Sequence, residues 1–126
     1  MAKFTDDSVL DAALAETATA TRQTLTSAQP ANFAGIAAVL LADITVTAGL
    51  GSGDFSAAAN GDTSGRKTTM AAQTDLTAAA SGTGNHTNLD DATTLLHCTT
   101  NANVSTNAGS QVDWSAWDIE FEDVTP

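Results

Sequence analysis

The clearest alternation of apolar and polar residues lies near the C-terminal end of the chain, in Asp118-Ile119-Glu120-Phe121-Glu122. Alternation with a period of two predicts a half-buried β-strand with an apolar inner face and an acidic outer face. Both tryptophans lie beside this stretch, although only 5% of the chain is aromatic. We therefore expect four residues to anchor the core or a subunit interface: Trp114, Trp117, Ile119 and Phe121.

The pattern of the first 18 residues predicts an N-terminal helical segment. Thr5 or Asp6 can cap its start, because a short polar side chain accepts hydrogen bonds from the free N–H groups there. Apolar residues at helical spacing would form its buried face: Val9, Leu10, Ala13 and Leu14. A second short helix is expected over residues 33–41, capped by Asn32.

Residues 43–126 have the short strands and turns of a β core. Residues 43–48 alternate between apolar and polar, and further strands are expected over 64–73, 75–80 and 93–100. Segments rich in Gly and Asn, such as 81–85, are interpreted as turns. The sequence thus predicts a mainly β protein with a single domain over residues 1–126. Its architecture would be a β-sandwich or barrel-like domain with one or two short N-terminal helices.

The acidic net charge of the chain excludes some classes of binding partner. Four Lys and Arg residues against fifteen Asp and Glu residues give a formal net charge of -11. Nucleic acids and anionic membranes both need clustered cations, so neither is an expected partner. The apolar run at residues 33–42 is too short to span a membrane. No apolar signal segment follows Lys3, so we expect synthesis in the cytoplasm without secretion by a standard route.

A core built largely from Ala and Thr buries little apolar area per residue. Assembly with copies of itself, or docking on a scaffold, would supply the missing burial. The single cysteine, Cys98, excludes an intrachain disulfide and lies in an apolar run, so we expect a buried free thiol.

Two sets of side chains could hold an ion. His86 and His97 could face each other across a hairpin, with Asp90 and Asp91 nearby; the alternative is one surface and one half-buried histidine. Oxygen ligands for calcium could come from Asp54, Asn60 and Asp62, but the alternative is that they cap turns, since their spacing does not fit a calcium loop. We expect no metal, cofactor or catalytic site, and hence no enzyme, because no recognisable frame places an acid and a base together.

Arg66 and Lys67 form the only pair of adjacent cations in the chain. In so acidic a protein, both should be engaged by carboxylates. The first possibility is a set of intrachain salt bridges. The second is a contact with an acidic surface of a neighbouring protein.

Five stretches of the chain can be compared with a known class of protein: residues 1–14, Gly61-Asp62-Thr63-Ser64-Gly65-Arg66-Lys67, Ala80-Ser81-Gly82-Thr83 with His86, Thr93-Thr94-Leu95-Leu96, and Trp117-Asp118-Ile119-Glu120. Taken together, these stretches resemble small virion proteins of tailed bacteriophages, which are often encoded among the head genes. His86-Thr87-Asn88 is more polar than the strand that this resemblance implies there.

The resemblance implies a multi-copy structural role, and capsid decoration (cement) is the role that we expect. Such a protein would bind the major capsid protein on the outer capsid surface, stabilise the head and self-associate, with a trimer as our guess. The alternative is a tail, fibre or neck component that binds a host surface or another virion protein, with exposed tryptophans stacked on sugar rings. The candidate interface residues are Phe4, Arg66, Lys67, Trp114, Trp117, Ile119 and Phe121.

Overall fold

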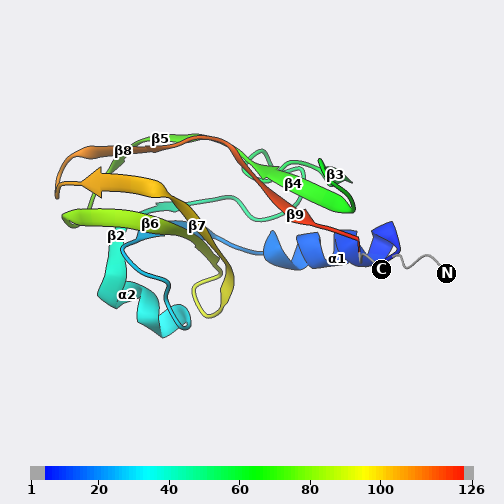
Figure 1. The fold of residues 1–126 in the computed structure, drawn as a ribbon, viewed down its shortest axis with the longest axis horizontal. Helices are drawn as coiled ribbons and strands as arrows, with labels where there is room; N and C mark the ends of the chain where they lie inside the picture. Colours follow the sequence, from blue (N-terminus) through cyan, green and yellow to red (C-terminus); the bar gives the residue numbers. More distant parts are fainter. Residues whose placement is uncertain (1–4, 124–126) are drawn as a thin grey trace. The chain divides into compact units, whose positions relative to one another are not determined.

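A computed structural model of the chain describes residues 5–123 (Figure 1). It contains two α-helices, α1 (Asp7–Thr17) and α2 (Ile36–Val39), and a 3-10 turn at Phe33–Gly35. The strands are β1 (Arg22–Thr26), β2 (Leu40–Thr45), β3 (Ala59–Asn60), β4 (Arg66–Met70), β5 (Gln73–Thr77), β6 (Gly82–Asp90), β7 (Leu95–Thr106), β8 (Gln111–Trp114) and β9 (Trp117–Phe121). With 46% strand and 15% helix, the predicted mainly β class is confirmed. None of the described helices has the length and apolar character to cross a membrane.

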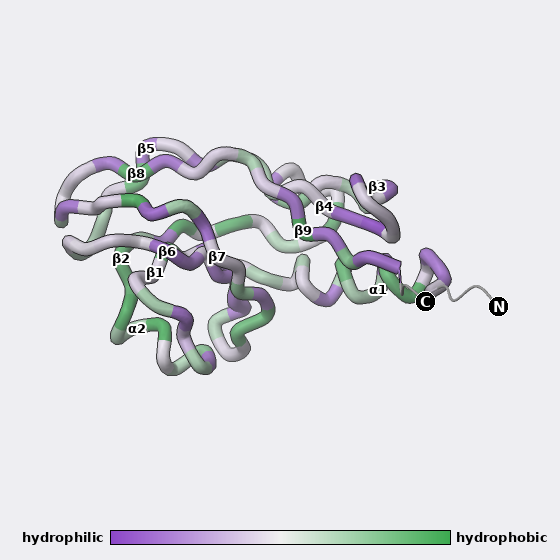
Figure 2. The backbone as a smooth tube through the Cα atoms, in the orientation of Figure 1, coloured by the Kyte–Doolittle hydropathy of each residue, from purple (hydrophilic) through white to green (hydrophobic). Residues whose placement is uncertain are grey.

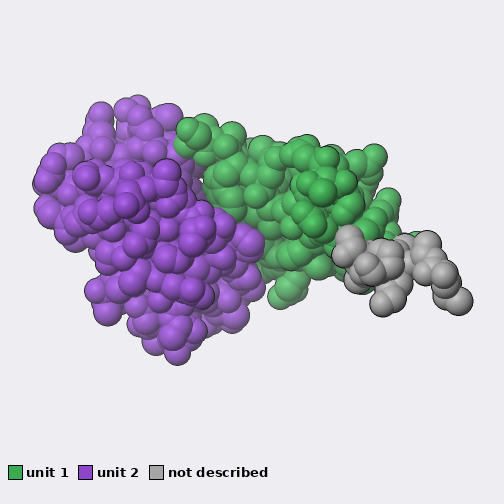
Figure 3. Space-filling view, viewed as in Figure 1, with its two compact units in different colours: residues 1–19, 47–72, 115–126 green, residues 20–46, 73–114 purple. Residues whose placement is uncertain are grey.

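The chain forms two compact units, and each is built from separate segments (Figure 3). Unit 1 comprises residues 1–19, 47–72 and 115–126, and unit 2 comprises residues 20–46 and 73–114. The predicted division into an N-terminal helical segment (1–18) and a β core (43–126) differs from this arrangement, because β1 and β2 belong to the same sheet as β6 and β7. That the chain is a single domain stays a prediction.

Unit 2 contains two packed sheets. Its larger sheet has the strand order β2-β1-β6-β7 with antiparallel pairing throughout, and the smaller pairs β5 with β8. One face of the larger sheet contributes Leu25 and Ala42 to a core, and the smaller sheet contributes Leu76, Val112 and Trp114. Two sheets burying apolar residues against each other form a β-sandwich-like layer pair, as predicted.

The opposite face of the larger sheet is polar although it is buried. Asn88 on β6 lies between Thr24 and Thr26 on β1, and its amide nitrogen donates to both hydroxyls at 3.2 and 3.0 Å. All three side chains are fully buried. At the end of the same face, Arg22 lies 5.8 Å from the ring centre of Phe33 in the 3-10 turn. Hydrogen bonds between strands thus replace apolar contacts on this side of the sheet.

Unit 1 combines a small sheet with the N-terminal helix. The strand order is β3-β4-β9, and α1 packs on β4 and β9. The buried side chains of α1 are Leu10, Leu14 and Thr17, and the core also contains Phe55, Met70 and Ile119. Asp6 caps the helix, as expected, by accepting from the Ser8 N–H at 2.9 Å. The predicted buried face was partly wrong, because Val9 and Ala13 are exposed.

The residue pattern did not predict β6, because residues 81–85 were interpreted as a turn, although the resemblance implied a strand at residues 86–88. Gly84 is in fact inside the strand: a Cβ atom there would lie 2.5 Å from Leu25 Cγ. The glycine is present because the core approaches the backbone closely, and not because the chain turns. His86, Thr87 and Asn88 are polar because this strand belongs to the hydrogen-bonded interior of unit 2.

The second predicted helix is shorter than expected. Asn32 does cap the 3-10 turn, since its side chain accepts from the Gly35 N–H at 2.9 Å. The helix ends at Val39, and residues that the prediction assigned to it begin β2 at Leu40. Leu41 and Ala42 are buried in the sheet, so tertiary packing outweighs the helix propensity of this Ala- and Leu-rich run.

Candidate functional site

The candidate interface residues are distributed over both units. Trp114 belongs to unit 2, and Arg66, Lys67, Trp117, Ile119 and Phe121 belong to unit 1. Phe4 lies outside the described residues. The residues of each unit are therefore described separately.

Trp114 is a core residue of unit 2. Only 9% of its surface is exposed, and it packs with Leu25 and Val112. Its indole Nε1 donates to Thr87 Oγ1 at 3.2 Å, which joins the two sheets of the unit. Of the two roles predicted for Trp114, the structure shows the anchor of the core.

The C-terminal strand β9 alternates as predicted. Ile119 is 1% exposed and opposite Thr68, while Trp117 and Phe121 are half-buried on the same face. The acids on the other face lie opposite the polar residues of β4: Asp118 opposite Thr69, and Glu120 opposite Lys67. Figure 2 shows hydrophilic stretches in both β4 and β9.

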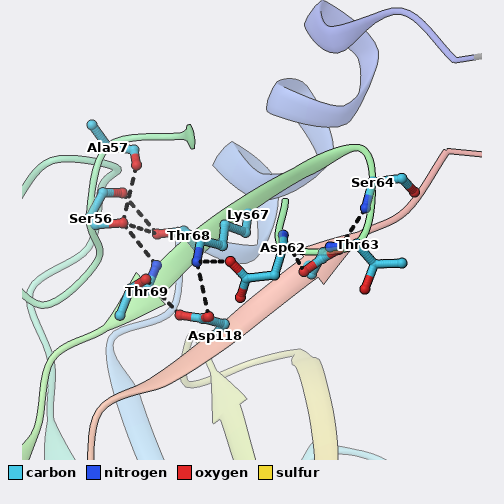
Figure 4. A network of polar contacts seen from close by, with 10 residues as sticks. Ser56, Ala57, Asp62, Thr63, Ser64, Lys67, Thr68, Thr69 and Asp118 are labelled. Atoms are coloured by element: carbon cyan, nitrogen blue, oxygen red, sulfur yellow. Dashed lines mark hydrogen bonds and ion pairs between the residues drawn. The ribbon is translucent and has the colours of Figure 1, made fainter. Parts of the chain in front are cut away.

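Lys67 is held between two carboxylates. Its Nζ lies 2.7 Å from Asp62 Oδ1 and 3.2 Å from Asp118 Oδ2, and Thr69 Oγ1 donates to Asp118 Oδ1 at 2.6 Å (Figure 4). The hydrogen bonds to Asp62 and Asp118 raise the pKa of Lys67. The Thr69 hydroxyl, followed by Lys67, lowers the pKa of Asp118. This cluster of charges joins β4, β9 and the loop after β3.

Glu120 occupies a ring of backbone donors in that same loop. Its carboxylate accepts from the N–H groups of Asp62 and Thr63 at 3.0 Å each and from Ser64 at 3.2 Å. Successive N–H groups that converge in this way form an anion-binding nest, here filled by a side chain of the chain itself. The bonds from Thr63 and Ser64 lower the pKa of Glu120.

Arg66 is also engaged within unit 1. Its Nε donates to Asp11 Oδ1 on α1 at 2.7 Å, and its Nη1 donates to Asn60 Oδ1 at 2.8 Å. The hydrogen bond to Asp11 raises the pKa of the guanidinium group. The intrachain interpretation of Arg66 and Lys67 is therefore confirmed, and a contact of either with an acidic neighbour stays a prediction.

A third cation, Arg22, forms ion pairs with two carboxylates in unit 2. Its Nε lies 2.9 Å from Asp90 Oδ2, and its Nη1 lies 3.6 Å from Asp43 Oδ2. Asp90 is fully buried and also accepts from the Ala92 N–H at 3.0 Å. Lys3, the fourth basic residue, lies outside the described residues. Each basic residue that the structure describes is thus paired with carboxylates of its own unit.

The candidate histidine site is not assembled. His86 lies opposite Thr100, and His97 lies opposite Leu89. Positions 86 and 89 are on opposite faces of β6, so the two histidines do not face each other, and the first of the two possibilities is not the one observed. Both are half-buried, and burial lowers the pKa of His97. Cys98, expected to be buried, is also half-buried, and burial raises its thiol pKa.

The candidate calcium ligands have separate roles in the fold. Asp54 accepts from the Thr47 N–H at 2.6 Å, Asn60 accepts from Arg66, and Asp62 pairs with Lys67. Over residues 5–123, no group of three or more acidic, histidine or cysteine side chains has the arrangement of a metal site. The observed contacts are those of structural side chains.

The edge of β7 is a surface that the sequence did not predict. This strand is the outermost of its sheet and the longest in the structure, with 12 residues. It contains no Asp, Glu, Lys, Arg or Pro. The absence of charge was visible in the sequence, but a strand's place at the edge depends on contacts that a single sequence does not reveal.

Comparisons with protein-family models, with curated proteins and with solved structures gave no match.

Proposed function

We propose that this chain is a structural protein of a bacteriophage virion, of the capsid-decoration type. It would bind the major capsid protein on the outer surface of the head and stabilise the shell. The observation that supports this role is that the described basic side chains form ion pairs within the protein. Arg22, Arg66 and Lys67 all bind carboxylates within their own units, so the chemistry of these groups serves the fold.

The remaining charge suggests the chemistry of the capsid site. With a net charge of -11 and the described cations paired internally, the accessible charge of the protein is acidic. A complementary capsid surface would present Lys or Arg side chains around an uncharged contact area. A shell repeats that site many times, so weak binding of each copy is strengthened if neighbouring copies also contact one another.

Add-back to heads tests the proposal. Heads from a phage deleted for this gene are incubated with the purified chain or with buffer alone, and disruption by heat or chelator is followed by light scattering. We expect the added chain to bind in proportion to the major capsid protein and to raise the disruption temperature. Absence of the chain from mature wild-type particles, or binding without any gain in resistance, would contradict the proposal.

The same experiment distinguishes capsid decoration from the alternative role as a tail, fibre or neck component. Sugar stacking by Trp114 is disfavoured by its burial, and Trp117 is half-buried. If labelled protein were found only at the tail or neck, in a few copies per particle, the decoration role would be wrong.

A further inference from the structure

The two edges of the four-stranded sheet in unit 2 differ in their backbone hydrogen bonds. At the β2 edge, the carbonyl oxygen of Leu41 accepts from the N–H groups of Ala79 and Ala80 at 2.8 and 3.3 Å. At the other edge, β7 pairs with β6 on one side, and within residues 5–123 no strand pairs with its second side. An unpaired edge presents backbone donors and acceptors that another strand can bind.

Charge protects the other edges. Every other edge strand longer than two residues carries at least one acid: Asp43 in β2, Asp75 in β5, Asp113 in β8, and Asp118 and Glu120 in β9. Charged side chains are a common protection against pairing of edges, because they oppose the approach of a second strand. In β7 this protection is absent. Two copies of so acidic a protein therefore meet less repulsion at this strand than at the other edge strands longer than two residues.

The exposed part of β7 includes a bulge. The pairing with β6 shifts between Gly84 and His86, and the Asn101 side chain spans this irregularity by donating to Gly84 O at 3.4 Å and to Ala102 O at 2.7 Å. Residues 101–103 of β7 lie opposite the single residue Asn85, and the regular ladder resumes at Val104. Residues 102–105 are all exposed, so this stretch combines the end of the bulge with the first residues of the resumed ladder.

Val104 adds an apolar contact to that stretch. It is 36% exposed and is one of two exposed large apolar side chains within residues 5–123. It lies opposite Gly84, where a Cβ would point at the core residue Leu25. Residues paired in this way point to the same face, so Val104 lies at the rim of the apolar core of unit 2. Covering it would extend the core.

We propose that β7 is a self-association edge, at which residues 102–105 pair in antiparallel fashion with the same residues of a second copy. A two-fold axis near Asn103 would make the two edges self-complementary, because the same donors and acceptors face each other on both sides. The expected product is a dimer and not the trimer guessed from the sequence. This inference deepens the proposed function by naming one partner of a multi-copy protein.

An isosteric charge change tests the pairing. Asn103→Asp would place two carboxylates close together at the axis, and it should weaken self-association about tenfold, measured by sedimentation equilibrium. The control is Asn107→Asp, which makes the same change at an exposed residue just outside the strand. We expect added NaCl to restore part of the loss, because salt screens the new repulsion.

Hydrogen exchange of the wild-type chain gives a measurement that needs no variant. The amide hydrogens of residues 102–105 should exchange more slowly as the protein concentration rises, while those of the exposed loop at residues 51–53 should not change. A monomer at all accessible concentrations, a trimer, or equal effects of the two substitutions would overturn the proposal. Since no capsid is present, these outcomes leave the head-binding proposal to be judged by the add-back experiment.

Discussion

Glu120 shows how one acidic side chain can hold a loop against a strand. Its carboxylate accepts from three consecutive N–H groups and so fixes residues 62–64 beside β9. Gly61 permits this fit, because a Cβ there would lie 2.8 Å from Glu120 Oε1 and closer still to the Ser64 carbonyl oxygen. The acid face predicted from the alternation of β9 thus organises a neighbouring loop.

Replacement of Glu120 by Gln should lower the stability of the protein in a pH-dependent way. The amide keeps the size of the side chain but loses the charge that the N–H groups of Thr63 and Ser64 stabilise. These bonds depress the pKa of Glu120 below its ordinary value of 4.5. The stability they provide is therefore fully present above about pH 4.5 and is lost as the pH falls through the folded-state pKa.

Urea unfolding of the wild type and Glu120→Gln at a series of pH values checks this prediction. The difference in free energy of unfolding should be constant at neutral pH and shrink below about pH 4.5. Glu122→Gln, the same change at an exposed residue, serves as the control for net charge. A pH-independent difference would show that the charge of Glu120 is not what holds the loop.

At the scale of elements, Gly84 in β6 should not tolerate a side chain. Gly84→Ala would bring a methyl group within 2.5 Å of Leu25 Cγ, in a core where overpacking costs about 1–3 kcal/mol. Gly35→Ala is the matched control, because its nearest neighbour would be 3.6 Å away and its φ of -74° suits alanine. Thermal unfolding should show a large loss for the first and none for the second. Equal effects would mean that the strand can shift to make room.

The same two strands show what the sequence could reveal about the elements. The alternation of β9 is local, so its inner and outer faces were predicted correctly. Gly82 and Gly84 carry the same local signal whether they end a strand or allow Leu41 and Leu25 to approach it. Only the partner from a distant part of the chain distinguishes the two cases, so the local pattern did not predict the start of β6.

Prediction of the candidate site was limited in the same way, because the sequence does not show which distant residues come into contact. Engagement of Arg66 and Lys67 by acids could be predicted from composition. Their partners could not: Asp11 is 55 residues from Arg66, and Asp118 is 51 residues from Lys67. The composition predicts that the few cations will form ion pairs, whereas the fold determines which acids they pair with. For the edge strand β7, the sequence showed the absence of charge but not the missing neighbour.

At the scale of the whole molecule, the excess of acidic groups opposes folding, so salt should stabilise this protein. The ion pairs of the described cations are few beside a net charge of -11, and repulsion among the remaining carboxylates acts over long distances. Raising the ionic strength from about 0.01 M to about 0.15 M shortens the screening length from about 30 to about 8 Å. Repulsion between distant acids is then screened strongly, while close pairs such as Lys67 with Asp62 at 2.7 Å lose less.

Calorimetry in a NaCl series at neutral pH should therefore show Tm rising by several degrees over this range. Near the sequence pI of about 4.1, the net charge is small, and the same salt series should leave Tm almost unchanged. A Tm that fell with salt at neutral pH would mean that the ion pairs outweigh the repulsion. In that case the ion pairs of Arg22, Arg66 and Lys67 would stabilise the folded chain more than the acidic surface destabilises it.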